Sequence, residues 1–461
     1  MKMNDLLLST IVFYMAWVII PILLEVIPAI FNIIQLIKKR IKNKQAEPIK
    51  HLPEITVIIP VYNSADTLRN CIQSVYESDY DNRLIYIMVV NNGGKDQSFD
   101  VFSKCQLDFP ELNMNWLTSK QGKSKALNLA LFNSAGKYII HIDSDGVLHP
   151  QALRNMVTYF EHNEDIHCVT GTILTDPAMV DNTDKFLLRF LRKLEFCEYA
   201  QAFLAGRNFE AEFNSIYTLS GAFSAFRKST ILKTKLYNTD TVCEDTQITF
   251  QVREWLNQKV SLCTDAFFFV DPIEDVNKLY TQRQRWQRGE LEVAHMFERS
   301  KKTVKIKNTK KKRFNVITKL LFYDHTFALP RMIWYFALIC LVFMNYPLRL
   351  VIISIVLIYC FNVMTAFLFY ICISLFLNTN KYLRRYYVRK WYLVFFLPLY
   401  NFMVFWFRFA GIINAIKGEQ VWRTNNLTEE RRCFVETIRK DFSGVTRVLD
   451  KMREKVNEDE K

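Results

Sequence analysis

The stretch Lys137-Tyr-Ile-Ile-His-Ile-Asp-Ser-Asp145 is a short apolar run that ends in two carboxylates. Residues 138–142 are typical of a strand in the buried centre of a sheet. Alternate residues of an extended segment point the same way, so Asp143 and Asp145 could bind one hard cation. Gly146 then lets the chain turn away from the core. An ordinary solvated turn is the alternative, because Asp and Ser are common in loops.

Strands and helices are predicted to alternate along this part of the chain. Residues 55–60 and 85–90 are short β-branched runs, and residues 64–75 and 125–132 carry apolar side chains at helical spacing. This alternation predicts an α/β domain with a doubly wound, mostly parallel sheet. Right-handed crossovers would bring the ends of several strands to one edge of that sheet.

Polar residues end three of the predicted strands. They are Pro60-Val-Tyr-Asn63, Asn91-Asn92 and Asp143-Ser-Asp145. We expect them to lie together at the carboxyl edge of the sheet, where open α/β folds bind their ligands. This convergence favours a binding site over a solvated turn.

The composition indicates separate soluble and membrane parts, since half of the 461 residues are apolar and 23% are charged. Residues 6–37 are almost wholly apolar and exceed the roughly 20 residues that a bilayer core requires, which predicts an N-terminal transmembrane helix. Residues 333–416 form a second apolar region of two or three spans. Between the two lie the α/β domain at 50–290 and a basic, interfacial helical segment at 291–332. Residues 417–461 form a charged tail.

Basic residues cluster beside the apolar segments, at 38–40, 301–313 and 384–390. The positive-inside rule therefore places the α/β domain in the cytoplasm of a multi-pass protein of the plasma membrane. These clusters account for the net charge of +14, since they attract anionic membrane lipids. Nucleic acid is not an expected partner, because the cations follow the membrane segments. The side on which the tail lies depends on the number of spans and stays open.

Three further motifs combine charges with turn or helix starts. Gly122-Lys-Ser-Lys-Ala-Leu-Asn128 opens a predicted helix with two cations, which suits an anionic ligand. Glu244-Asp245 precedes an amphipathic helix and could cap it or act chemically. Gln282-Arg-Gln-Arg-Trp286 sets guanidinium groups beside an indole, which suits phosphate oxygens and the face of a sugar ring. A basic surface helix anchored by one Trp is an equally acceptable interpretation of that last motif.

Together these motifs resemble the membrane-embedded family 2 glycosyltransferases of the processive type, which include cellulose, hyaluronan and poly-N-acetylglucosamine synthases. The resemblance covers residues 55–290 and the flanking apolar segments. Its motifs follow the family's order: Pro60-Val-Tyr-Asn-Ser64, Val90-Asn-Asn-Gly-Gly-Lys-Asp96, Gly122 to Asn128, Asp143-Ser-Asp145, Ser220-Gly-Ala222 with Phe226-Arg227, Glu244-Asp245 and Gln282 to Trp286. Phe203-Leu-Ala-Gly-Arg-Asn208 and Tyr280 to Trp286 are similar to a bacterial, Gram-positive subgroup associated with exosortase-like systems.

The resemblance implies the GT-A nucleotide-sugar fold and an inverting, metal-dependent transfer. It assigns Asp245 as the catalytic base, and it assigns Asp145 and Asp143 to an Mg²⁺ or Mn²⁺ ion that neutralises the leaving diphosphate. The implied donor site comprises Pro60, Tyr62, Asn63, Asn92, Asp96, Lys123, Asp143, Gln282 and Arg285. The implied acceptor site comprises Trp286, Glu244 and Arg227, with Trp286 under the terminal sugar.

One departure concerns the donor, because the family usually has two acids where this chain has Asn91-Asn92. An Asn side chain can still accept a hydrogen bond from uracil, so a UDP-sugar is the expected donor. The expected product is an exopolysaccharide or cell-surface glycan, extended at the cytoplasmic face and exported, with accessory membrane subunits as further partners. Two alternatives stay open: a single addition to a lipid-linked acceptor, and a catalytically silent scaffold subunit of a glycan-assembly complex.

Overall fold

The computed structural model describes residues 10–14, 17, 19, 22–42, 49, 51–239, 241, 243–303, 328–417 and 428. Much of the expected interfacial segment at 291–332 and nearly all of the expected tail at 417–461 lie outside the described residues.

The strands belong to one α/β domain, and their bounds are β1 (Ile55–Val61), β2 (Ile85–Asn91), β3 (Asn113–Thr118), β4 (Tyr138–Ile142), β5 (Gly146–Leu148), β6 (Ile166–Thr175), β7 (Phe223–Arg227) and β8 (Lys259–Val270). The helices of this domain are α3 (Leu68–Tyr76), η2 (Asn82–Leu84), α4 (Ser98–Asp108), α5 (Lys123–Asn133), α6 (Ala152–His162), α7 (Pro177–Asp181), α8 (Phe186–Gln201), η3 (Ala202–Arg207), α9 (Asn208–Glu212), α10 (Lys228–Ile231), α11 (Glu244–Phe250), η4 (Gln251–Trp255) and α12 (Val276–Thr303). The flanking helices are η1 (Ile22–Val26), α2 (Ile27–Lys42), α14 (Ala328–Phe343), α15 (Leu348–Phe376), η5 (Leu377–Thr379), α16 (Lys381–Val388), η6 (Trp391–Phe395) and α17 (Leu397–Lys417).

The sheet has eight strands in the order β3-β2-β1-β4-β7-β6-β8-β5, and it is mixed rather than mostly parallel. The first four strands in this order are mutually parallel, and β6 is parallel to β8. In contrast, β7 is antiparallel to both neighbours, and β5 is antiparallel to β8. The direction of β7 follows from its starting point, because Phe223 pairs with Ile142 at the carboxyl end of β4 and the strand must run back from there. The sequence pattern predicts strands but carries no signal for this reversal.

The predicted convergence of strand ends is present in the parallel half of the sheet. The ends of β1 and β2 lie side by side, with Val61 paired to Asn91, and β4 runs parallel to β1. The Asn92 amide donates to the Val61 carbonyl at 2.8 Å, and the Ser64 and Ser144 hydroxyls are 2.8 Å apart. Hydrogen bonds therefore join the loops after β1, β2 and β4 at one edge.

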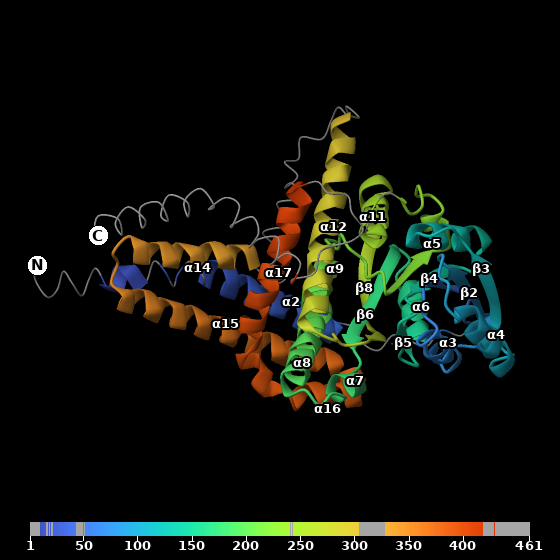
Figure 1. Ribbon diagram of the computed structural model, residues 1–461, viewed down its shortest axis with the longest axis horizontal. Coiled ribbons are helices and arrows are strands. Elements are labelled where there is room, and N and C mark those ends of the chain that lie inside the picture. The colour runs from blue at the N-terminus through green and yellow to red at the C-terminus, as the bar shows by residue number, and fades with distance from the viewer. Residues whose placement is uncertain are drawn as a thin grey trace, which may run out of the picture.

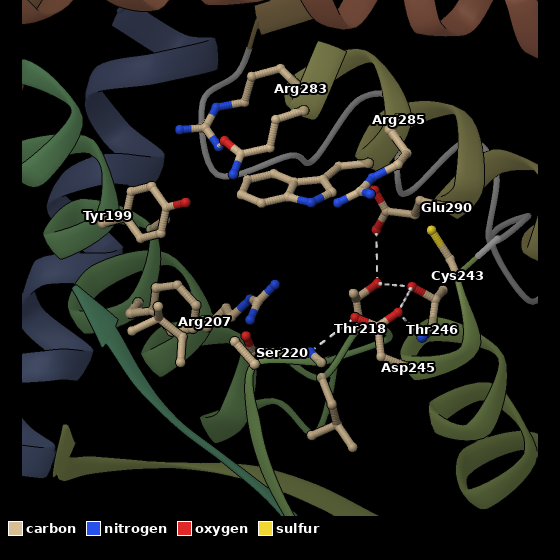
Figure 2. Close-up of a pocket in the computed structure, with 18 of the residues that line it drawn as sticks. Tyr199, Arg207, Thr218, Ser220, Cys243, Asp245, Thr246, Arg283, Arg285 and Glu290 are labelled. Carbon is tan, nitrogen blue, oxygen red and sulfur yellow. Dashed lines mark hydrogen bonds between the residues drawn. The ribbon is translucent and has the colours of Figure 1, made fainter. Parts of the chain in front are cut away.

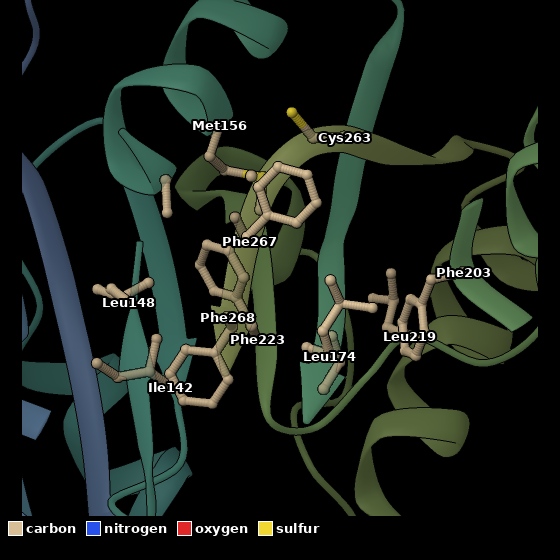
Figure 3. Packing of buried hydrophobic residues seen from close by; sticks show 14 of the residues in the cluster. Ile142, Leu148, Met156, Leu174, Phe203, Leu219, Phe223, Cys263, Phe267 and Phe268 are labelled. Carbon is tan, nitrogen blue, oxygen red and sulfur yellow. The ribbon is translucent and has the colours of Figure 1, made fainter. Parts of the chain in front are cut away.

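A buried core lies behind this edge, between the sheet and its covering helices. Figure 3 shows Ile142 and Leu148 on one side of this core and Leu174 on the other, with the rings of Phe223, Phe267 and Phe268 among them. Gly146 has a different role from the predicted turn, because it is the first residue of β5 and pairs with Val270. A Cβ atom at this position would lie 2.2 Å from Cε1 of Phe268. The glycine therefore gives the Phe268 ring room directly after Asp143-Ser-Asp145.

The apolar C-terminal region forms helices at one end of the molecule, with α14 and α15 extending away from the sheet (Figure 1). Among the described residues, the segment Leu348–Thr379 is long and apolar enough to cross a membrane by length and composition, with a mean hydropathy of 2.4. A shorter apolar helix covers Ile333–Phe343. Of the several membrane spans expected from the sequence, the described residues therefore support one, at Leu348–Thr379.

The N-terminal apolar segment, predicted at 6–37 as a transmembrane helix, continues into α2 beside the α/β domain. The Lys39 ammonium donates to Asn208 Oδ1 at 2.8 Å and lies 2.7 Å from a Glu212 carboxylate oxygen. Leu36 is fully buried, and α2 contacts both α9 and α15. The end of this predicted membrane segment is thus attached to the α/β domain.

Candidate functional site

A cavity of about 460 Å³ lies between the carboxyl edge of β4 and the helices α8, η3, α11, α12 and α17. Figure 2 shows the cavity with Asp245 and Cys243 on one side, Tyr199 on the other, and Arg283 and Arg285 above it. The sequence-predicted residues that line it are Lys123, Asp143, Asp145, Glu244, Asp245, Gln282, Arg285 and Trp286. Residues from four separate motifs thus share one cavity.

The β4 edge of the cavity carries a cation between carboxylates. The Lys123 ammonium, in the first turn of α5, is 2.6 Å from Asp143 Oδ1 and 3.3 Å from Glu244 Oε1. Burial opposes the charge of Lys123, but attraction to Asp143 and Glu244 prevails and raises its pKa. Burial also raises the pKa of Asp143, although Lys123 works against that shift. Lys123 therefore stays charged and links the β4 end to the start of α11.

Asp245 lies in the first turn of α11, and its carboxylate accepts hydrogen bonds from two backbone amides. Gly221 donates to its Oδ2 at 3.0 Å, and Thr246 donates to its Oδ1 at 2.7 Å. Burial and the neighbouring Glu244 charge raise the pKa of Asp245 to about 6, while Lys123 and Arg207 lower it. A carboxylate oriented in this way, with a pKa close to neutral pH, is suited to accept a proton from a substrate.

A chain of hydroxyl groups leads from Asp245 across the cavity wall to Glu290 on α12. The Thr246 hydroxyl lies 3.4 Å from Asp245 Oδ1 and 3.4 Å from the Thr218 hydroxyl, which donates to Glu290 Oε1 at 3.2 Å (Figure 2). The sequence analysis gave no role to Thr218, Thr246 or Glu290. Their link shows that α11 and α12 act together in placing the carboxylate.

The motif at 282–286 presents two faces of α12. Gln282, Arg285 and Trp286 line the cavity, and both Arg285 and Trp286 are exposed. Arg283 also lines the cavity but is buried, with its guanidinium carbon 4.5 Å from the Trp286 ring centroid and 5.3 Å from that of Tyr199. The interpretation as a merely basic surface helix is therefore wrong for Arg283.

Arg283 belongs to a buried ion network between α8, α12 and α17. Its Nη2 is 2.6 Å from Glu198 Oε2, and the Tyr400 hydroxyl donates to the same oxygen at 2.8 Å. Arg408 lies 3.7 Å from the other Glu198 oxygen. Burial disfavours the Glu198 charge, yet Arg283 and Arg408 outweigh it and lower its pKa. This network fixes α17 against the helix that carries Trp286.

Five residues of the implied donor site lie at the edge of the parallel half of the sheet and do not line this cavity. Asn92 accepts a hydrogen bond from the Gly122 amide, and Asp96 accepts from the Ala65 amide at 2.8 Å. Asn63 has a φ of +52° and accepts from the Lys95 amide at 3.1 Å. These three side chains organise the loops of the edge, next to Pro60 at the end of β1 and the half-exposed Tyr62.

The position of Arg227 does not agree with the implied acceptor site. Arg227 is the last residue of β7 and pairs with Tyr138, at the opposite end of β4 from Asp143. Its guanidinium donates to the carbonyls of Ile166, Phe160 and Asn163 and to the Tyr138 hydroxyl. Because β7 is antiparallel to β4, its start lies at the site edge and its end lies away from it. Arg227 therefore has a structural role.

The residues at the β4 edge are compatible with a divalent metal ion brought by a diphosphate. Among the described residues, no group of three or more His, Cys, Asp and Glu is placed to hold a metal ion by protein atoms alone. Asp145 is exposed at the cavity, beside Asp143. Mg²⁺ is commonly bound by one or two carboxylates together with substrate phosphates, and this pair of carboxylates fits that pattern.

Arg207 also lines the cavity and has no role in the sequence analysis. It is the last residue of η3, in the Phe203 to Asn208 motif, and its guanidinium carbon lies 4.5 Å from the Phe203 ring centroid. A charged residue after the apolar run 202–206 is the sequence signal that could have identified it.

The sequence of the chain is similar to that of known glycosyltransferases. Residues 56–233 match the family model described as Glycosyl transferase family 2. The poly-β-1,6-N-acetyl-D-glucosamine synthase of Staphylococcus aureus is 23% identical over 245 residues, which are 53% of this chain and 56% of that protein. The synthase of the same name from Staphylococcus epidermidis is 24% identical over 243 residues, 52% of this chain and 55% of that protein. The chain thus matches just over half the length of these relatives.

A solved structure is similar over most of the chain. The mannosyltransferase PcManGT from Pyrobaculum calidifontis, determined in complex with GDP-Man and Mn²⁺, superposes with a TM-score of 0.56 at 16% identity. The match covers 89% of this chain and 98% of that one. It shows a GT-A-like fold with a mixed sheet.

Proposed function

We propose that this chain, a glycosyltransferase with a family 2 domain, moves a sugar from a nucleoside diphosphate to a hydroxyl group of a glycan acceptor with inversion of the anomeric centre. The observation that carries the proposal is the position of Asp245. Its carboxylate lines the same cavity as the Lys123–Asp143 edge and the Gln282 to Trp286 motif, and its pKa is raised to about 6.

The chemistry follows from one carboxylate base placed beside the donor edge. Asp245 takes the proton of the acceptor hydroxyl as the oxygen attacks the anomeric carbon. The bond from that carbon to the diphosphate breaks, and the nucleoside diphosphate leaves with the electron pair. A single direct displacement inverts the anomeric configuration, and no covalent enzyme intermediate is required.

The cavity residues divide between donor and acceptor in this proposal. Arg285 and Gln282 bind the diphosphate, with Arg285 free to reach it because its side chain is exposed. Trp286 lies under the acceptor's terminal sugar. The residues at the end of β1 and β2, among them Asn92, face the nucleoside, which we expect to be uridine.

Asp145, with Asp143, would hold Mg²⁺ or Mn²⁺ at the donor diphosphate. When bound, such an ion neutralises charge on the leaving group. The carboxylate of Asp145 is available for this role because it is exposed at the cavity.

The product we propose is a membrane-associated polysaccharide made by repeated additions at the cytoplasmic face. The support for it is the similarity to the two staphylococcal synthases, together with the apolar helices that flank the domain. A single addition would instead give one product of fixed size, so the size distribution of labelled product on a gel separates the two functions.

The experiment that tests the proposal compares Asp245→Asn with the wild type. Loss of a general base typically costs about 10²- to 10⁴-fold in rate, so we expect that loss in sugar transfer with binding of the nucleotide sugar retained. Asp184→Asn is the matched control, because Asp184 is exposed and does not line the cavity. Wild-type turnover in the Asp245 variant would overturn the assignment of the base.

A further inference from the structure

Arg207 is a cation of the cavity wall that forms no ion pair with the described residues. Three of the other cations that line the cavity, Lys123, Arg283 and Arg408, form ion pairs with carboxylates. Arg207 has no ion pair or hydrogen bond within the described part of the chain, and its Nη1 is buried without a partner. Arg285 is also unpaired among the described residues, but water can solvate it because it is exposed.

Arg207 as a whole is half-buried, but its Nη1 is buried without a partner, and this has an energetic consequence. Burial lowers the pKa of its guanidinium, because the charged form loses hydration, although the charges of Glu210, Asp245 and Glu290 oppose the shift. A buried polar nitrogen without a partner is costly, and a charge in such a place is costlier still. An anion bound in the cavity would remove that cost and would gain charge-assisted hydrogen bonds.

The position of Arg207 separates it from the donor edge. Figure 2 shows Arg207 beside Ser220, on the side of the pocket that carries Tyr199, with Asp245 across from it. Its helical segment η3 contacts the helices α15 and α2 and the strands β6 and β8. The Lys123–Asp143 pair is instead at the end of β4.

Aromatic rings lie next to Arg207. Its guanidinium lies over the Phe203 ring, and the rings of Phe203 and Tyr199 are stacked with centroids 6.4 Å apart. Tyr199 in turn meets Trp286 edge to face at 6.3 Å. This wall of the cavity therefore combines the Arg207 cation, which has no ion pair with the described residues, with a row of aromatic rings. The row ends at Trp286, which we propose to lie under the acceptor sugar.

We propose that Arg207 binds an anionic group of the acceptor, either the phosphate of a lipid carrier or the carboxylate of an acidic sugar. This inference rests on the proposed function, because it takes the Tyr199 to Trp286 wall as the acceptor side. The position of Arg207 opposite Asp245 would place the anionic group of the acceptor next to the hydroxyl that reacts. Arg207 is then a substrate-binding residue that selects charged acceptors.

Binding to the purified full-length chain in detergent tests this inference without turnover. The probes are farnesyl phosphate against farnesol, and a glucuronate-containing disaccharide against its glucose counterpart. We expect the wild type to prefer the charged member of one pair, and the pair that shows the preference identifies the source of the anion. Arg207→Gln should remove that preference, a loss of roughly 10- to 100-fold for a charged hydrogen bond, and Arg207→Lys should keep part of it.

The controls separate binding from folding and from the donor site. Arg154→Gln, an exposed arginine that pairs with Asp79, should keep the preference. All variants should keep the wild-type melting temperature and their affinity for UDP. The inference is overturned if the wild type shows no preference in either pair, if Arg207→Gln keeps it, or if Arg207→Gln weakens UDP binding to the same degree. Sugar transfer is measured separately, so a chain that transfers sugar without the preference refutes this inference alone.

Discussion

At the residue scale, the proposed role of Asp245 as the base predicts that its raised pKa sets the pH dependence of transfer. The base must be ionised to accept a proton, so protonation below its pKa removes activity. Because burial and Glu244 raise this pKa to about 6, we expect kcat/KM to rise through about pH 6 and then level off. A profile of kcat/KM against pH, measured at saturating metal, would show this rise as its acidic limb.

The charge of Lys123 offers a control for that assignment. Lys123 lowers the pKa of Asp245, so its removal in Lys123→Gln should move the limb to higher pH. Lys278→Gln, an exposed cation on α12 paired with Glu274, should leave the limb in place. A limb that does not move in Lys123→Gln would mean that another group titrates in the profile.

At the element scale, the buried network of Arg283 and Glu198 holds α12 between α8 and α17. Gly411 allows α17 to pack closely on α12, because a Cβ at this position would lie 2.6 Å from the Gln284 carbonyl oxygen. Gly289 allows α12 to pack closely on the start of α11, because a Cβ there would lie 1.9 Å from Cys243 Sγ. Figure 1 shows α12 and α17 side by side between the sheet and the apolar helices. The position of Trp286, which we propose to lie under the acceptor sugar, therefore depends on the contact between α12 and α17.

We expect Arg283→Met to destabilise the protein strongly. Removal of one partner of a buried ion pair typically costs about 3–5 kcal/mol, because the other charge stays buried. Lys278→Met removes an exposed ion pair between the start of α12 and Glu274, just before the helix. Such a pair is typically worth about 0–1 kcal/mol. Thermal unfolding in detergent should show a clearly lower midpoint for Arg283→Met alone. Equal midpoints for the two variants would show that the network adds no stability.

The sequence predicted the local elements better than their long-range partners. The strands at 55–60 and 85–90 and the helix at 125–132 are present, because apolar spacing is a local signal. The Asp143, Asp245 and Trp286 motifs do share one cavity. The antiparallel β7 was not predicted, and neither was the role of Arg227, because strand direction depends on where a long connection ends. The Glu198–Tyr400 contact joins residues about two hundred positions apart, which no local pattern encodes.

At the scale of the whole molecule, α15 is, among the described residues, a helix long and apolar enough to cross a bilayer. Its exposed apolar residues near the middle include Met364 and Phe367. An Asp at the centre of a membrane helix costs about 2.5–3.5 kcal/mol, so Met364→Asp with Phe367→Asp should reduce the amount of chain that stays in membranes after alkaline carbonate washing.

The matched control for the α15 variant is Leu107→Asp, which changes an exposed apolar residue of α4 in the α/β domain. It should leave the membrane fraction unchanged. Release of the wild type itself by carbonate would show that α15 does not span the membrane.

The central claim is that the cavity around Asp245 transfers sugar from a nucleotide. The most direct measurement incubates membranes that contain the wild-type chain, or its Asp245→Asn variant, with a panel of labelled nucleotide sugars, with and without Mn²⁺. The account predicts that one donor, most simply a UDP-sugar, labels a glycan in wild-type membranes only, and that Mn²⁺ increases the labelling. Absence of incorporation from every donor, or equal incorporation in the two membranes, would contradict it.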